Sequence, residues 1–195
     1  MIICGLTGGV GMGKSTAAGF FLELGACVVD TDQLARQLVQ LGQPALVEIQ
    51  NKFGENIVSS SGELRRDELA RTIFAYAEAR KKLEDILHPL IRESWLAQIE
   101  IWRKENRRLA IVVIPLLFET QAETYFDTLI CAACSSVEQH ERLQARGWND
   151  EQIRQRIMAQ LPAETKMTRS DYVLWTEGSL ASHQQQAAQI FQKIS

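Results

Sequence analysis

The stretch Gly8-Gly9-Val10-Gly11-Met12-Gly13-Lys14-Ser15-Thr16 decides the fold of this chain. It follows a short apolar run, 2–6, and has the spacing Gly-x-x-x-x-Gly-Lys-Ser of a phosphate-binding loop (P-loop). In such a loop, successive backbone N–H groups surround a phosphate, and the next helix directs its partly positive N-terminus at the same anion. A plain glycine-rich turn is the alternative, but it leaves the combination of strand, loop, Lys-Ser and helix unexplained. The stretch therefore predicts a site for a nucleoside triphosphate.

The spacing also gives individual residues a role. Lys14 is placed to reach the outer phosphates as a point charge, and the Ser15 hydroxyl is placed to ligate Mg²⁺. Met12 stands where a small residue is common, but the loop uses its backbone at that position, so we expect phosphate binding to be retained. The residues expected to contact the nucleotide are Gly9, Gly11, Met12, Gly13, Lys14, Ser15 and Thr16.

Length and charge narrow the class of protein. A chain of 195 residues fits one domain, in which any second lobe is an insertion. With 21 Lys plus Arg against 24 Asp plus Glu, the net charge of −3 argues against nucleic acid as a partner. No apolar run reaches the roughly 20 residues that span a bilayer, and the first residues do not read as a secretory leader. We therefore expect a cytoplasmic protein without membrane contact; the sequence does not predict its oligomeric state.

Strand-like and helix-like segments alternate along the chain, which predicts an α/β fold with helices on both faces of a parallel sheet. The strands are expected to be mostly apolar because parallel strands are covered on both sides. Together with the loop, the pattern indicates a P-loop nucleoside triphosphate hydrolase/kinase fold with a five-stranded sheet. The expected strands are 2–6, 26–29, 109–114, 127–132 and 172–175.

The segments between the strands predict one domain, 1–195, with two embellishments. The stretch 43–106 reads as helices interrupted by a turn at 59–62, and we expect it to be a helical, substrate-binding lobe. The polar stretch 137–169, broken at Gly147 and Pro162, is expected to be a mobile lid. The core then comprises 1–42, 107–136 and 170–195, and 179–194 is expected to form a surface helix that closes the sheet.

The four cysteines read as packing residues. Cys131 and Cys134 have the spacing of a redox or zinc pair, but positions three apart on a strand point to opposite faces, and no second Cys or His pair is nearby to complete a zinc site. We expect them to be buried free thiols.

The loop alone leaves several classes of nucleotide-binding protein open. A guanine-specific switch carries Asn-Lys-x-Asp, whereas Asn51-Lys52-Phe53-Gly54 has glycine in the base-reading position, and the sequence contains no Asp-x-x-Gly. The chain is also too small for a large motor ATPase. These observations favour a small-molecule kinase over a GTPase switch, a motor ATPase or a non-catalytic binding protein.

Two aspartates follow the second expected strand, in Asp30-Thr31-Asp32. The carboxyl end of this strand reaches the same crevice as the phosphate-binding loop, so Asp32 is the candidate general base, or orienting group, for an acceptor hydroxyl. The alternative is that Asp32 only caps a helix beginning at Gln33.

At these residues the chain resembles the dephospho-CoA kinase family. The family begins with Gly-Leu-Thr-Gly-Gly-x-Gly-x-Gly-Lys-Ser, which 5–15 match, and the resemblance covers nearly the whole chain. Each later block is weakly specific, but their order and spacing are highly specific. These blocks are Asp30-Thr31-Asp32 with Ala35-Arg36, Leu64-Arg65-Arg66 with Ile73-Phe74, His88-Pro89-Leu90-Ile91, and Pro115-Leu116-Leu117-Phe118-Glu119.

The resemblance implies transfer of the ATP γ-phosphoryl group to the ribose 3′-hydroxyl of dephospho-CoA, with Mg²⁺, to give CoA and ADP. Lys14 and Asp32 would act on the donor and the acceptor. Arg142 and Arg146 lie four residues apart, hence on one helical face, and match the paired arginines of the family's lid. The alternative is a solvated face on which Arg142 pairs with Glu138.

The resemblance also assigns residues to the acceptor side. Arg66 is a candidate partner for an acceptor phosphate, with a surface ion pair to Asp67 or Glu63 as the alternative. His88 is expected to have a structural or substrate-lobe role, with Pro89 breaking or restarting a helix beside it. Glu119 could serve Mg²⁺ through water, or the acceptor, and the sequence does not choose between them.

One departure from the family pattern concerns the loop that tends to border the adenine. The family has Asp-x-Val-Ile-x-Asn-x-Gly, whereas 171–178 carry Thr176 in place of the asparagine. The departure therefore concerns contacts to the base rather than phosphate chemistry. Another P-loop small-metabolite or nucleotide kinase stays open as the alternative.

Overall fold

The fold is built on a parallel sheet. The computed structural model describes residues 1–195, except for the side chain of Phe74. Within them the sheet has five strands in the order β2-β3-β1-β4-β5, so the predicted α/β fold is confirmed and each strand end lies within one residue of its expected position. The strands are β1 (Ile2–Thr7), β2 (Cys27–Asp30), β3 (Leu109–Val113), β4 (Thr128–Ala133) and β5 (Tyr172–Trp175).

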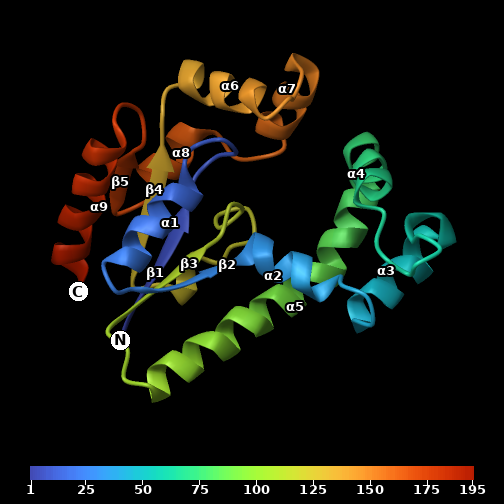
Figure 1. Cartoon of the computed structure of the whole chain (residues 1–195), viewed down its shortest axis with the longest axis horizontal. Helices are drawn as coiled ribbons and strands as arrows, with labels where there is room; N and C mark the ends of the chain where they lie inside the picture. The colour runs from blue at the N-terminus through green and yellow to red at the C-terminus, as the bar shows by residue number, and fades with distance from the viewer. The chain divides into compact units, whose positions relative to one another are not determined.

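The chain divides into two compact units. One comprises 1–30 and 99–195 and contains the whole sheet; the other comprises 31–98. Figure 1 shows the path of the chain through the sheet and its helices. The helices are α1 (Lys14–Glu23), α2 (Thr31–Leu38), α3 (Pro44–Phe53), α4 (Arg66–Ala75), α5 (Ala77–Lys104), α6 (Ser136–Ala145), α7 (Asp150–Met158), α8 (Ala163–Thr168) and α9 (Leu180–Ile194), with 3₁₀ turns at Glu55–Ile57 and Glu123–Tyr125.

The sheet is covered on both faces because its strands are apolar on both faces. Cys4 and Leu6 of β1 belong to a buried cluster with α1 and α9, and Figure 1 shows these two helices on the same side of the sheet. Gly5, between them, faces the opposite way: a Cβ there would lie 2.6 Å from Leu117 and 3.0 Å from Phe126. The segment that follows β3 therefore covers the second face of β1.

Capping residues define where the helices of the first unit begin. The Ser135 hydroxyl accepts a hydrogen bond from the Glu138 N–H at the start of α6, and Asn149 forms a reciprocal capping box with Gln152 at the start of α7. The break predicted at Gly147 is confirmed, since α6 ends at Ala145 and Gly147 has a φ of +82°. In the described part of the chain, no helix is both long and apolar enough to cross a membrane.

The second unit, 31–98, has a small apolar core of its own. Residues from α2 to α5 form this cluster, and an isolated antiparallel bridge joins Val58 to Leu64 across the turn predicted at 59–62. The buried members are Val39, Ile49, Ile57, Leu69 and Ile86. The expected break at Pro89 is wrong, because α5 continues through that residue to Lys104. Proline removes one N–H from the ladder, but the remaining bonds and apolar contacts of this long helix maintain its path.

The variant Pro89→Ala tests the cost of proline inside α5. Pro89 is exposed, and alanine would restore an N–H that can donate to the Asp85 carbonyl. We expect the free energy of unfolding, measured by denaturant titration, to rise by about 1–3 kcal/mol. Glu93→Ala, an exposed substitution in the same helix, is the control and should change stability by less than about 0.5 kcal/mol. If the proline and alanine forms have the same free energy of unfolding, Pro89 does not destabilise α5.

Candidate active site

The phosphate-binding loop joins the carboxyl end of β1 to the N-terminus of α1. Gly13 is the residue before α1 and has a φ of +79°, a left-handed conformation that favours glycine. The Lys14 ammonium donates hydrogen bonds to the carbonyls of Gly8 and Gly9, at 2.9 and 2.8 Å. A positive charge is therefore held against the loop that the sequence assigned to the phosphates.

Two glycines of the loop lie too close to neighbouring strands for any other residue. A Cβ on Gly8, whose φ is +144°, would lie 2.3 Å from the Ala132 carbonyl oxygen of β4. A Cβ on Gly13 would lie 2.9 Å from the side chain of Thr176, the residue after β5. The loop is thus packed against the carboxyl ends of β4 and β5, which determines its shape before any ligand binds.

A pair of glutamines holds the central peptide of the loop. The Val10 N–H donates to Oε1 of Gln160 at 2.9 Å, and Nε2 of Gln139 donates to the Val10 carbonyl at 2.7 Å. Gln139, on α6, is 6% exposed. The sequence does not predict either contact, because a glutamine in a polar helix is typical of a solvated surface, and only the fold brings these two residues to the loop.

Met12 packs beneath the loop. Its side chain is 3% exposed and clusters with Ala133 and Cys134, against Ala163 and Met167 of α8. Its carbonyl accepts a hydrogen bond from the Thr176 hydroxyl at 3.3 Å. The departure from a small residue at this position therefore changes the packing below the loop, while the backbone forms the loop surface.

The two arginines predicted for catalysis lie at the end of α6. The Arg142 guanidinium donates to Glu138 Oε1 at 2.8 Å and to the Thr176 hydroxyl and carbonyl at 2.8 and 2.6 Å. The ion pair considered as an alternative for Arg142 thus forms, but its guanidinium also binds the loop after β5. Arg146 follows the last residue of α6 and is exposed. Arg142 would have to exchange its Thr176 contacts to meet a phosphate directly.

A cavity of about 350 Å³ lies beside the phosphate-binding loop. Both predicted arginines line it, together with the end of the loop, the segment after β5 and the first turn of α9. The lining residues are Gly11, Gly13, Thr16, Arg142, Ala145, Arg146, Thr176, Gly178, Ser179, Leu180 and His183. The structure therefore groups Gly11, Gly13, Thr16, Arg142 and Arg146 around one hollow at the carboxyl edge of the sheet, where ligands of open α/β sheets bind.

Ser15 is exposed at the N-terminus of α1, beside Lys14. A hydroxyl oxygen suits a hard cation such as Mg²⁺. Within the described residues there is no cluster of three or more His, Cys, Asp or Glu side chains able to hold a metal ion. In nucleotide sites Mg²⁺ takes most of its ligands from phosphates and water, and the role of Ser15 toward it stays a prediction.

Glu119 has a buried partner that the sequence does not predict. Lys166 is fully buried, and its ammonium contacts Glu119 Oε1 at 2.8 Å and the Pro115 carbonyl at 2.6 Å. The same carboxylate oxygen accepts a hydrogen bond from the Leu161 N–H at 2.8 Å. The second oxygen, Oε2, is buried and has no hydrogen-bond partner among the described residues. Glu119 thus anchors α8 and the segment before it, and its role toward Mg²⁺ or an acceptor stays a prediction.

Three predicted residues lie in the unit 31–98. Helix α2 begins at Thr31, so Asp32 lies within its first turn rather than capping a helix that begins at Gln33. The Arg66 guanidinium, at the start of α4, donates to the Arg36 carbonyl of α2 at 3.4 Å. His88 is half-buried in α5, and its burial lowers the pKa of the imidazole. The roles given to these residues stay predictions.

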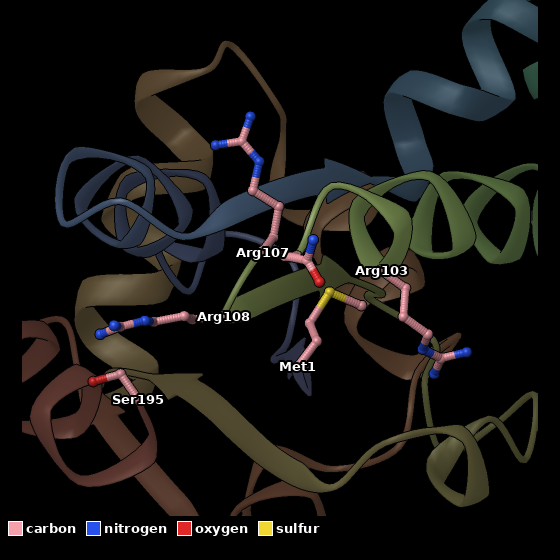
Figure 2. Close-up of a pocket in the computed structure, with 6 residues that line it drawn as sticks. Met1, Arg103, Arg107, Arg108 and Ser195 are labelled. Carbon is pink, nitrogen blue, oxygen red and sulfur yellow. The ribbon is translucent and has the colours of Figure 1, made fainter.

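A larger hollow, of about 580 Å³, lies at the opposite edge of the sheet, beside the starts of β1 and β3. Its lining includes Arg103, Arg107 and Arg108, but Figure 2 shows their side chains extending in different directions. Arg103 pairs with Glu100, and Arg107 pairs with Glu105. The three charges do not converge on one point, so the smaller cavity beside the phosphate-binding loop is the candidate active site.

Cys131 and Cys134 are free, buried thiols, as predicted. Burial is the main cause that raises the pKa of Cys131 to about 11, and burial also raises the pKa of Cys134. Such thiols hold little of the reactive thiolate at neutral pH. The pair therefore belongs to the packing of the core.

The phosphate-binding loop after β1, the cavity beside it and the sheet order define a P-loop kinase-type protein. The family model described as Dephospho-CoA kinase matches residues 2–182. A relative named Dephospho-CoA kinase from Syntrophotalea carbinolica is 37% identical and aligns over 100% of this chain and 92% of its own. The chain belongs to the dephospho-CoA kinase family.

Solved structures agree with this assignment. A crystal structure of a protein from Thermus thermophilus has a TM-score of 0.83 at 34% identity and covers 100% of this chain and 98% of its own. The structure of a dephospho-CoA kinase from Campylobacter jejuni has a TM-score of 0.72 at 27% identity, covering 99% and 96%. The similarity therefore extends over essentially the whole fold.

The variant Lys166→Met tests the buried ion pair. It would leave the Glu119 carboxylate without its cation, so we expect the free energy of unfolding to fall by about 3–5 kcal/mol. Adding Glu119→Gln removes the unpaired charge and should recover part of the loss. Urea titrations of both single variants and the double variant measure the coupling, and Lys52→Met, at an exposed position of α3, is the control. Strictly additive effects would contradict a direct interaction.

Thiol labelling tests the cysteine assignment. At pH 8 a thiol with a pKa of about 11, like that of Cys131, is only about one part in a thousand thiolate. We expect a thiol reagent to label the native protein first at Cys27, the one described cysteine that is not fully buried. Cys27→Ser should then leave little labelling until denaturant is added, as followed by mass spectrometry. Rapid native labelling of Cys131 or Cys134 would be inconsistent with packing thiols.

Proposed function

We propose that this protein transfers the γ-phosphoryl group of ATP to the ribose 3′-hydroxyl of dephospho-CoA, giving CoA and ADP. Membership of the dephospho-CoA kinase family supports the reaction, and the observation that carries it is the preformed phosphate-binding loop beside a cavity lined by two arginines. The 3′-hydroxyl oxygen forms the new bond to phosphorus as the bond to the bridging β,γ-oxygen breaks. We also propose that the enzyme acts in the cytoplasm on these small molecules, without nucleic acid or membrane.

On the donor side, the backbone N–H groups of the loop and the N-terminus of α1 bind the phosphates. Lys14 and the arginines at the end of α6 neutralise charge on the γ-phosphoryl oxygens as it is transferred. Mg²⁺ held at Ser15 and by the phosphates would supply further charge stabilisation. Because this reaction depends mostly on positioning and charge, the stiff packing of Gly8 and Gly13 against β4 and β5 supports the proposal.

On the acceptor side, Asp32 orients the 3′-hydroxyl and accepts its proton. Two features support this role: Asp32 follows β2 by two residues, at the carboxyl edge of the sheet, and it lies inside the first turn of α2 rather than serving as its cap. Arg66 and His88 belong to the helical unit that we propose holds the rest of the acceptor. Glu119 is proposed to act by anchoring α8, with its second carboxylate oxygen left for a ligand.

The reaction is tested by incubating the purified protein with Mg-ATP and one acceptor at a time: dephospho-CoA, adenosine, AMP or pantothenate. We expect ADP and a phosphorylated product, identified by mass spectrometry, with dephospho-CoA alone. Product with another acceptor and none with dephospho-CoA would point to a different P-loop metabolite kinase. ATP binding without transfer to any acceptor would point to a nucleotide-dependent binding protein.

The variant Asp32→Asn separates catalysis from binding. Loss of the proton acceptor should lower kcat by about 10²–10⁴-fold, while the Kd for ATP and the unfolding midpoint stay near those of the parent. Glu48→Gln, the same carboxylate-to-amide change at an exposed position of α3, should leave kcat unchanged. An undiminished kcat in Asp32→Asn would remove Asp32 from the mechanism.

A further inference from the structure

His183 is a buried polar side chain in the wall of the cavity beside the phosphate-binding loop. It lies in the first turns of α9, is 3% exposed and lines that cavity. Its Nε2 atom is buried and has no hydrogen-bond partner among the described residues. Nearly all buried polar atoms of proteins have a partner, so an unpaired nitrogen on a residue that lines this cavity is a candidate to bind a ligand there.

His183 contacts α1 at a point away from the helix end that faces the phosphates. Its ring packs edge-on against Phe20 of α1, with ring centroids 5.0 Å apart. Phe20 lies six residues beyond Lys14, which is about 9 Å along the helix axis from the end that faces the phosphates. A nucleotide whose phosphates occupy the loop would therefore reach His183 with its nucleoside end.

The charge state of His183 fits a neutral partner. Burial, and then the nearby Arg142 guanidinium, lower the pKa of the imidazole, so the ring is neutral around pH 7. A neutral imidazole donates from one ring nitrogen and accepts at the other, as the polar edge of a nucleobase requires. A phosphate would instead be matched by a cation, which Lys14 and the arginines supply.

In the neighbouring loop, the side chain and the carbonyl of Thr176 already form hydrogen bonds. The Thr176 hydroxyl accepts a hydrogen bond from Arg142 and donates one to the Met12 carbonyl, and the Thr176 carbonyl also accepts from Arg142. Thr176 is itself only 4% exposed. The Thr176 hydroxyl has thus already donated its one proton, whereas Nε2 of His183 has no partner among the described residues.

We propose that His183 is a specificity-determining residue, whose Nε2 makes a hydrogen bond to the base of the bound nucleoside triphosphate and sets the preference among bases. The inference rests on the proposed function only in taking this cavity as the nucleoside part of the donor site. Binding of the base would satisfy the buried nitrogen. Base selection then depends on a side chain of α9, while the phosphates are held mainly by the backbone of the loop.

The experiment measures Kd for Mg-ATP and Mg-GTP by isothermal titration calorimetry, without acceptor, for the parent and three variants. His183→Leu removes the polar atom, His183→Asn places an amide nearer Nδ1, and His183→Gln places one nearer Nε2. We expect the leucine and asparagine variants to lose about tenfold in ATP affinity and most of the discrimination between the bases. The glutamine variant should stay within about threefold of the parent.

Two controls separate recognition from folding. The unfolding midpoint is measured for each variant without nucleotide. It should not fall in His183→Leu, because this substitution removes a buried unpaired nitrogen. His140→Leu, on α6 and outside the cavity lining, should leave both dissociation constants unchanged. The KM for dephospho-CoA should also stay constant across the His183 variants.

Unchanged ATP affinity and base discrimination in the folded leucine and asparagine variants would overturn the proposal. An equal loss of affinity for ATP and for GTP, together with a loss of stability in the unliganded protein, would also overturn it, because His183 would then be a packing residue. If the parent binds ATP with His183-dependent selectivity but does not phosphorylate dephospho-CoA, the proposed function fails while this inference stands. If it phosphorylates dephospho-CoA with selectivity independent of His183, only this inference fails.

Discussion

The central position of β1 is the constraint on which the rest of the structure depends. β1 pairs with β3 on one side and β4 on the other, so the loop at its carboxyl end emerges in the middle of the sheet edge. The segments that follow β4 and β5 emerge beside it. Because parallel strands all end at the same edge, the segments that follow them lie close together there. Glycine is needed where they come closest, as at Gly8 and Gly13.

Buried polar contacts tie the segment 137–169 to this edge. Gln139 and Gln160 hold the Val10 peptide, and Lys166 binds Glu119 and the Pro115 carbonyl. Each group is largely out of water, so separating it from its partner leaves an unpaired polar atom or charge. Any movement of the predicted lid would therefore have to break these bonds.

The departures of this chain from its family pattern concern packing and the nucleoside end of the site. Met12 extends the packing below the loop, where the backbone does the binding. Thr176 joins Arg142 to the Met12 carbonyl, and its hydroxyl proton is donated to that carbonyl. Phosphate binding by such a loop depends mainly on backbone N–H groups, which these side-chain changes leave in place.

The sequence by itself determined the sheet, the phosphate-binding loop and the family, because apolar strands and the glycine spacing are local patterns that follow from backbone geometry. Local sequence also determined some helix ends, for instance the end of α6 before Gly147. It did not determine that α5 continues through Pro89, since the contacts of a long helix outweigh one missing N–H. Only the tertiary structure brought Gln139, Gln160 and Lys166 to their partners and left His183 Nε2 buried without one. These partners lie as far as 150 residues apart in the chain, and burial is decided by packing across that distance, which no local pattern records.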